Sequence, residues 1–132
     1  FDAYDTEILA EIQEAFGDGV PLPVAFGYSD TPVEEIRKIP RCMIGAIRKV
    51  CDGQALTLSV DNVLCGGGSL YTRFAPMQEA YRAFFGTGTL QADAEQVKTY
   101  VSRLGISLTE KPYLNFVRMD KLASLDDAEG IL

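Results

Sequence analysis

Apolar residues recur at helical intervals in several parts of the chain. Ile8, Ile12 and Phe16 are spaced four residues apart, so residues 2–16 are expected to form a helix with one apolar face. The same periodicity, with capping residues, proline or glycine at the segment ends, predicts further helices at 31–38, 41–51, 76–86 and 93–104. The pattern therefore indicates four or five helices.

Three other segments have the pattern of strands. Residues 56–60 alternate strictly between apolar and polar, which predicts a strand with one face buried and the other in water. Residues 22–28 and 113–119 are mostly apolar and are expected to be buried. Asn115 and Arg118 interrupt the last of these, and a charge within an apolar strand must find a carboxylate or reach solvent.

No linker, repeat or low-complexity tract divides the chain, so we expect one α/β or α+β domain over residues 1–132. Its sheet is expected to be mixed, with at least three strands, and to be built around 22–28 and 113–119. A hydrophobic content of 47% is enough for a core without disulfides. The chain begins at Phe1 rather than methionine, and it is expected to be the N-terminal part of a longer protein.

Charge and hydropathy exclude several kinds of partner. The formal net charge is −7, from 12 basic and 19 acidic residues, which argues against sequence-independent binding to nucleic acid or to an anionic membrane. No apolar run reaches the length of about 18 residues that a membrane span needs, and no signal peptide is evident. We therefore expect a cytoplasmic protein.

The three cysteines, at irregular spacing, indicate free thiols in a reducing compartment rather than a disulfide framework. The chain has no histidine, which excludes Ser-His and Cys-His nucleophile pairs and His-ligated zinc or haem within it. No Cys-x-x-Cys pair is present to begin a zinc or iron–sulfur site. No catalytic residue and no cofactor follow from the sequence, and whether the protein is an enzyme stays open.

The most distinctive stretch consists of Cys65, Gly66, Gly67, Gly68 and Ser69. Three glycines remove every Cβ beside the cysteine, so the backbone can present N–H groups to a ligand or approach another chain closely. The predicted strand at 56–60 leads directly to this stretch. A thiol presented by a glycine-rich loop is therefore the leading candidate for a binding site.

Cys42 is the second thiol of interest, because it lies at the predicted start of a helix beside Arg41. The helix dipole and the guanidinium would both favour its thiolate. With Cys65 it could hold a small ligand, a metal ion or an electrophile, or undergo redox chemistry. Other metal ligands would come from Asp61, from a second subunit of a homo-oligomer, or from outside this chain.

Two other hypotheses compete with the thiol site. In the first, the cysteines are buried apolar fillers and the glycines serve close packing in a structural or assembly module. In the second, weaker one, Gly66 to Ser69 form an anion nest assisted by Arg73. The phosphate-loop and dinucleotide patterns are both absent from this stretch, which favours a plain tight turn over the nest.

The order of these motifs resembles that of the uncharacterised prokaryotic domain-of-unknown-function family 169, in its N-terminal part. The family pattern begins with a Pro-Val-Ala strand and a cysteine that opens a helix, which are here Pro23-Val24-Ala25 and Cys42. It continues with a strand ending before Cys-Gly-Gly, here residues 55–60 with Cys65-Gly66-Gly67-Gly68, and with a later apolar strand, here residues 113–119. The family has no established activity, so the resemblance implies no reaction. Its second half carries further cysteines and glycines, so that, if the family's site is shared between the halves, this chain holds only one wall of it. This chain departs from the pattern at Asp120-Lys121-Leu122, where members tend to have Pro-Leu.

Overall fold

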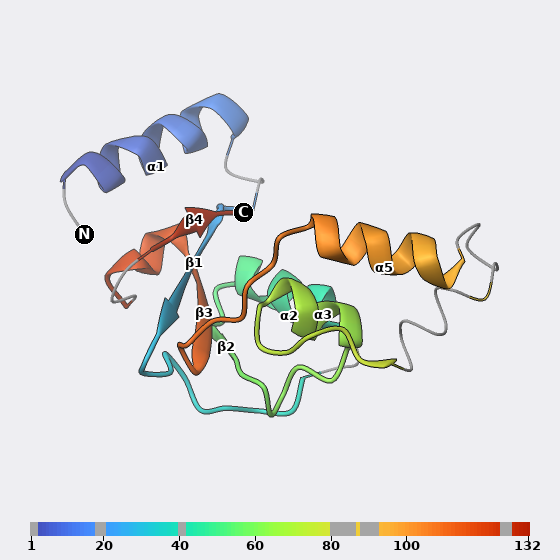
Figure 1. Cartoon of the computed structure of the whole chain (residues 1–132). Helices are drawn as coiled ribbons and strands as arrows, with labels where there is room; N and C mark the ends of the chain where they lie inside the picture. Colours follow the sequence, from blue (N-terminus) through green and yellow to red (C-terminus); the bar gives the residue numbers. More distant parts are fainter. Residues whose placement is uncertain (1–2, 18–20, 40–41, 80–86, 88–92, 125–127) are drawn as a thin grey trace.

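A four-stranded antiparallel sheet organises the described part of the chain (Figure 1). The computed structural model describes residues 3–17, 21–39, 42–79, 87, 93–124 and 128–132. The sheet has the strand order β2-β3-β1-β4, with β1 at Val24–Ser29, β2 at Leu56–Leu58, β3 at Tyr113–Arg118 and β4 at Gly130–Ile131. The fold is therefore of the α+β class, as expected. The described strands pair in antiparallel fashion throughout, rather than with mixed direction.

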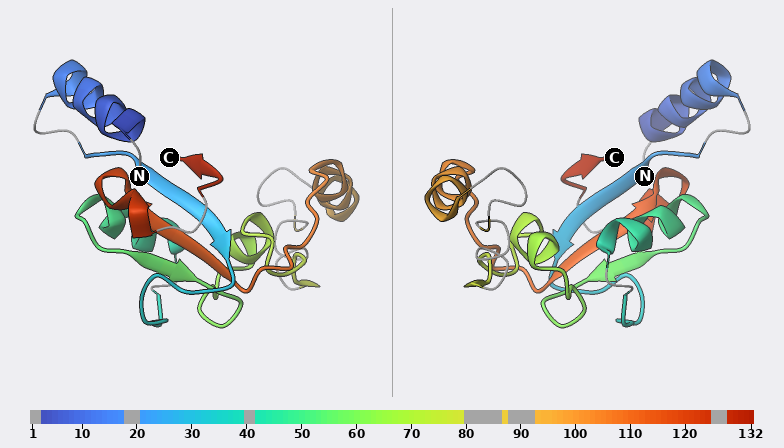
Figure 2. Two further views of the ribbon diagram at one scale, coloured as in Figure 1. Left: turned by 90° about the vertical axis from the view of Figure 1, so that its left-hand side faces the viewer. Right: turned by 90° about the vertical axis from the view of Figure 1, so that its right-hand side faces the viewer.

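The helices surround this sheet unevenly. They are α1 at Ala3–Phe16, α2 at Met43–Cys51, α3 at Gly66–Tyr71, α5 at Ala94–Arg103 and the 3-10 helix η1 at Met119–Ser124. Figures 1 and 2 show α1 and α5 at opposite ends of the molecule, with α2 against the sheet. The helix expected at 76–86 falls mainly on residues outside the described part of the chain.

The hydrophobic core lies between the sheet and α2. Three strands contribute side chains to it, namely Val24, Leu56, Leu58, Leu114 and Phe116. Ala46 and Val50 of α2 are buried against these residues. The two strands expected to be central are neighbours, since β1 pairs with β3 along its whole length. Burial of these segments is therefore confirmed, and it provides the fixed frame for the loops and short helices.

The predicted helix at 93–104 is also confirmed. Asp93 and Gln96 have the spacing of a capping box, and both of its hydrogen bonds form. The Asp93 carboxylate accepts from the Gln96 N–H at 2.8 Å, and the Gln96 side chain accepts from the Asp93 N–H at 3.0 Å. Local sequence alone accounts for where α5 begins.

The helix predicted at 31–38 does not form. This segment crosses the sheet in irregular conformation instead, and buried side chains satisfy its backbone. The Val33 N–H donates to Thr57 Oγ1 at 3.1 Å and to Asn115 Oδ1 at 3.3 Å, while Asn115 Nδ2 donates to the Thr31 carbonyl at 2.8 Å. A helix this short gains little without packing, and the hydrogen bonds to Thr57 and Asn115 replace those that it would form.

The same segment changes the environment of β2. Its polar side chains were expected to face water, but Thr57 is 1% exposed and Ser59 is 3% exposed. Asn62 closes the arrangement: its Nδ2 donates to the Thr57 carbonyl at 2.9 Å and to the Arg37 carbonyl at 3.1 Å, and its Oδ1 accepts from the Ser59 N–H at 2.8 Å. Two buried amides thus hold residues 31–39 in place.

Arg118 finds the carboxylate that its place in an apolar strand required. Its Nε and Nη2 donate to the two carboxylate oxygens of Asp120 at 2.7 and 2.8 Å, and its Nη1 donates to the Cys51 carbonyl at 3.3 Å. Hydrogen bonding to this guanidinium lowers the pKa of Asp120 from its ordinary value. The pair therefore ties the end of β3 to the end of α2.

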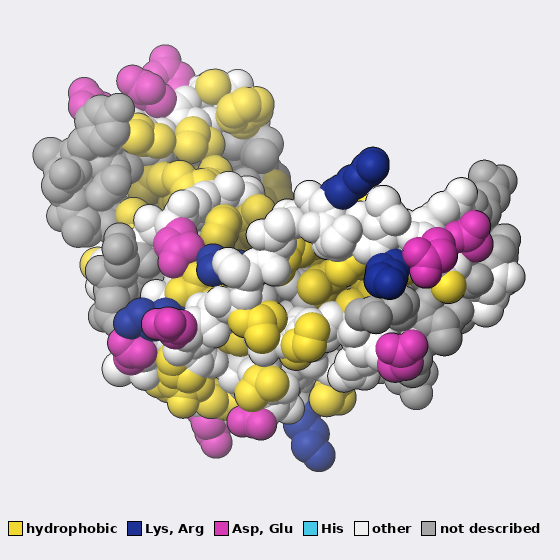
Figure 3. All heavy atoms as spheres, viewed as in Figure 1, with side chains coloured by type: hydrophobic (Ala, Val, Ile, Leu, Met, Phe, Trp, Pro, Cys, Tyr) yellow, Lys and Arg dark blue, Asp and Glu magenta, His cyan; other side chains and the backbone are white. Residues whose placement is uncertain are grey.

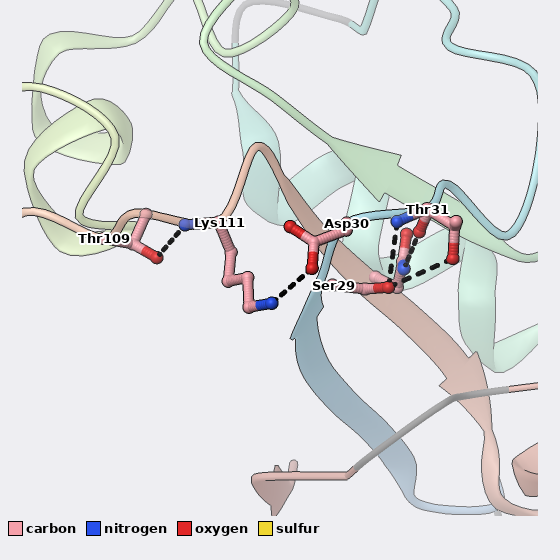
Figure 4. Close-up of polar contacts among 6 residues, drawn as sticks. Ser29, Asp30, Thr31, Thr109 and Lys111 are labelled. Carbon is pink, nitrogen blue, oxygen red and sulfur yellow. Dashed lines mark hydrogen bonds and ion pairs between the residues drawn. The ribbon is translucent and has the colours of Figure 1, made fainter.

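A second ion pair lies at the opposite end of the central strands. Figure 4 shows the Lys111 ammonium group donating to the Asp30 carboxylate, while the Lys111 N–H donates to Thr109 Oγ1 at 3.1 Å. Hydrogen bonding to Asp30 raises the pKa of Lys111. This contact joins the end of β1 to the loop before β3, although both side chains are largely exposed.

Helix α1 is more exposed than its apolar pattern predicts, whereas the C-terminal residues join the sheet. The apolar face of α1 is only half-buried at Ile8 and Ile12, and Phe16 is 67% exposed, so the helix is not part of the central core. Near the C-terminus, η1 spans Met119–Ser124 and the short strand β4 spans Gly130–Ile131, and Leu132 exchanges two backbone hydrogen bonds with Val24, at 2.7 and 3.0 Å.

Replacing Asn115 with alanine is expected to lower the free energy of unfolding by about 2 kcal/mol, because Val33, Thr57 and Thr31 lose buried hydrogen-bond partners. Urea denaturation monitored by circular dichroism measures this change. Gln13→Ala, which removes an exposed amide from α1, is the control and should leave stability within about 0.5 kcal/mol. Equal effects of the two substitutions would contradict the structural role assigned to Asn115.

Candidate functional site

The glycine-rich stretch forms a short helix and not the expected loop. Cys65 is the N-cap of α3, with φ −85° and ψ 122°, and its carbonyl accepts from the Ser69 N–H at 2.8 Å. Glycine disfavours helix by up to about 1 kcal/mol per residue, so local propensity does not explain this element. Burial of Gly66, Gly68, Ser69 and Leu70 does, because these residues pack inward.

At Gly68 this helix approaches the first residue of α2. A Cβ atom built there would lie 3.1 Å from Val63 Cγ1, 3.2 Å from Met43 Sδ and 3.4 Å from Cys65 Cβ. A Cβ atom built at Gly67 has no neighbour within 4 Å. Of these two glycines, Gly68 therefore serves close packing, while Gly67 borders open space.

A residue at the start of α2 reaches α3, the helix that Cys65 caps. Cys42 is the N-cap of α2 and directly precedes Met43, whose sulfur meets α3 beside the Cβ of Cys65. Neither cysteine side chain makes a capping hydrogen bond, and both are free thiols. Cys42 is exposed and Cys65 is half-buried. Cys51, at the other end of α2, packs against the core.

Ser69 and Arg73, the remaining residues of the predicted site, have partners elsewhere. Ser69 Oγ donates to the Val63 carbonyl at 3.1 Å. Arg73 Nε donates to the Ser107 carbonyl at 2.8 Å, and its guanidinium carbon lies 5.5 Å from the centre of the Tyr28 ring. Arg73 also adopts a φ of 62°, which is uncommon for a residue with a side chain. Its contacts anchor the loop around Ser107.

Burial and charge act against each other on Tyr28. Desolvation raises the pKa of its phenol, and the positive charge of Arg73 opposes that change. The Tyr28 hydroxyl donates to the Thr72 carbonyl at 2.7 Å, and its ring meets Phe74 edge to face at 6.3 Å. These contacts attach the residues that directly follow α3 to β1, and so they help to fix the position of α3.

Metal binding by these thiols would require ligands beyond the described part of this chain. Among the described residues, no group of three or more His, Cys, Asp or Glu side chains is arranged to hold a metal ion. Asp61, the expected carboxylate, is exposed. The sulfur atom of Met43 is a soft ligand in the same region as the two thiols.

Sequence reasoning identified both thiols but missed the contact that relates them. Met43 lies on the apolar stripe of its helix. That pattern predicts burial but not which residue Met43 contacts. Val63 lies in the turn before α3 and has no periodic signal at all. Cys42 and Met43 are adjacent at a helix start, which could have suggested a sulfur-rich surface. That Gly68 lies opposite Met43 depends on the tertiary structure and could not be predicted from local sequence.

The chain matches no protein-family model, no curated protein and no solved structure. Among the described residues, no helix is both long and apolar enough to cross a lipid bilayer.

Alanine at Gly68 is expected to give a protein less stable than alanine at Gly67, by about 1 kcal/mol. Both substitutions gain the same helix propensity, whereas only the Gly68 side chain meets Val63 and Met43 at short distance. Thermal and urea unfolding of the two variants measure the difference. Equal stability would show that α2 and α3 do not meet at Gly68.

Proposed function

We propose that this chain is a binding domain in which the thiols of Cys42 and Cys65 engage a small thiophilic ligand, either a soft metal ion or an organic electrophile. The observation that carries the proposal is the contact of Met43 with Gly68, beside Cys65, which relates two cysteine-capped helix starts. Thiolates are strong nucleophiles and soft ligands, and neither thiol is tied up in a disulfide.

The surroundings of the thiols fit a ligand that arrives from solution. Ile44 and Leu64, which are close in sequence to Cys42 and Cys65, are 64% and 65% exposed. Apolar surface beside a thiol would add contact area to a ligand with a hydrophobic part. A cytoplasmic setting, in which thiols stay reduced, belongs to the same proposal.

The second candidate function is an assembly module, and exposed apolar side chains favour it. The described residues include ten large hydrophobic side chains that are exposed, among them Val60, Leu64 and Tyr71. Figure 3 shows apolar side chains at the surface across the lower middle of that view. The assembly hypothesis drawn from the sequence assumes buried cysteines, and the exposure of Cys42 does not fit that assumption.

Membership of domain-of-unknown-function family 169 is part of the proposal and not a premise for it. The Pro23-Val24-Ala25 stretch, Cys42 and the Cys65-Gly66-Gly67-Gly68 stretch are its support. Under this proposal, the ligands that the described cysteines lack come from a further segment or a second subunit. The metal and electrophile forms of the proposal are separated by experiment.

Alanine at Cys42 or at Cys65 is expected to weaken binding of Cd²⁺ at least tenfold, because each removes one thiolate ligand. The matched control is Cys51→Ala, which removes a thiol packed against the core and should change binding less than twofold. Thiolate-to-metal absorbance during titration of the reduced protein measures all four proteins. Equal effects of the three substitutions would overturn the assignment of the metal form.

The electrophile form has its own readout. Iodoacetamide is expected to modify the native protein first at Cys42, which is exposed, and more slowly at the half-buried Cys65 and Cys51. Peptide mapping by mass spectrometry after short reaction times gives the order. Faster modification of Cys51 than of Cys42 would contradict it.

The assembly function predicts self-association that depends on exposed apolar residues. Leu64→Ser is expected to shift the protein toward monomer by at least tenfold in dissociation constant, because Leu64 is 65% exposed and can contribute apolar area to an interface. Sedimentation velocity over a range of concentrations measures this change. Leu108→Ser, at 51% exposure but on another loop, is the control. A monomer at every concentration in the unmodified chain would exclude self-assembly as the function.

A further inference from the structure

A small cavity lies beside α2 and is lined by Ala46 and Lys49 of that helix. Its volume is about 120 Å³, and it opens between α2, the irregular segment before it and the start of β2. Ile39, Ala46 and Leu56 give it apolar walls, and these residues belong to the core or pack against it. Lys49, Arg37 and Lys38 also line it, with side chains that are exposed.

The charge of this cavity is opposite to that of the whole chain. Glu34 is its one acidic lining residue, against three basic ones, whereas the chain carries a net charge of −7. Within the described part of the chain, Arg37, Lys38 and Lys49 have no ion-pair partner, unlike Lys111 and Arg118. Three cations against one carboxylate create a net positive local potential that favours an anion.

The wall formed by residues 34–39 is held in place by the sheet. Asn62 Nδ2 donates to the Arg37 carbonyl at 3.1 Å, and Asn62 itself is 4% exposed. The backbone that carries Arg37 is therefore anchored before any ligand arrives. Preorganisation of this kind lowers the entropy lost on binding.

We propose that this cavity binds a small carboxylate with a short aliphatic body. The carboxylate lies at the opening among Arg37, Lys38 and Lys49, and the aliphatic body contacts the apolar wall at Ala46 and Leu56. Apolar cavities of about 150 Å³ hold a molecule the size of benzene, so the volume here suits a ligand of about four carbon atoms. The inference is independent of the thiol site and of any metal.

The test uses butyrate as the probe and the whole chain in its reduced form. Butyrate is expected to shift the backbone amide signals of Ile39, Lys49, Ala55 and Leu56 in two-dimensional NMR spectra, saturably. Butyramide has the same shape without the charge and should bind at least fivefold more weakly, while acetate lacks most of the apolar contact and should also bind more weakly. Inorganic phosphate, at matched ionic strength, tests whether any anion suffices.

Substitutions at the opening test the charged residues, and α2 offers a matched control. Lys49→Gln and Arg37→Gln are each expected to weaken butyrate binding about fivefold, while Glu34→Gln is expected to strengthen it. Arg48→Gln makes the same charge change one residue away on α2, outside the cavity, and should alter binding less than twofold. All four side chains are at least partly exposed, and dispersed amide spectra confirm that each variant is folded.

Four results would overturn the proposal. The first is an absence of saturable shifts at the cavity residues. The second is equal weakening by Arg48→Gln and Lys49→Gln, which would indicate a general effect of net charge. The third is butyramide binding as tightly as butyrate, which would show that the cations take no part. Phosphate binding equal to that of butyrate would likewise reject the carboxylate and its apolar contact in favour of a plain anion site.

Discussion

Burial of two asparagine amides is the constraint on which the rest of this structure depends. Residues 31–39 cross a sheet without forming helix or strand, so their backbone groups need partners from side chains. Asn115 supplies them at one end and Asn62 at the other, with Thr57 between. The polar residues of β2 and β3 are therefore buried and satisfied. Without these amides, nothing in the local sequence would hold this segment against the sheet, and the wall it gives to the cavity beside α2 would be lost.

The sequence predicted those elements whose signals are local and regular. The capping box at Asp93 forms as its spacing indicates, and the central strands are buried as their composition requires. Residues 31–38 also carry a local helix signal, in the order Thr31-Pro32-Val33-Glu34, yet the Val33 N–H bonds to Asn115 instead of to its own segment. Tertiary hydrogen bonds outweigh a capping pattern when the helix would be short. The strand β4 has only two residues and so offers no periodicity to detect.

The candidate thiol site shows the same division between local and tertiary information. The position of Cys42 before a helix followed from the stripe of α2, and that position is confirmed. Three glycines after Cys65 argued against a helix, and α3 forms because its inward side is packed. The approach of Met43 to Gly68 depends on how two helices meet, which no spacing in the sequence records. The cavity was equally beyond prediction, because one of its walls is the segment that was expected to be a helix.

The two proposed sites share α2, since the thiol site uses Cys42 and Met43 at its start and the cavity uses Ala46 and Lys49 further along it. Lys49 follows Cys42 by seven positions, which is about 10 Å along the axis at the rise of a helix. That separation is close to the Debye length at physiological ionic strength, so direct electrostatic coupling between a ligand at each end is weak. The helix dipole disfavours an anion near Lys49, which means that the side-chain cations alone must hold a carboxylate there. Any coupling between the sites therefore has to pass through movement of α2, and its packing against Phe116 and Leu58 in the core resists such movement.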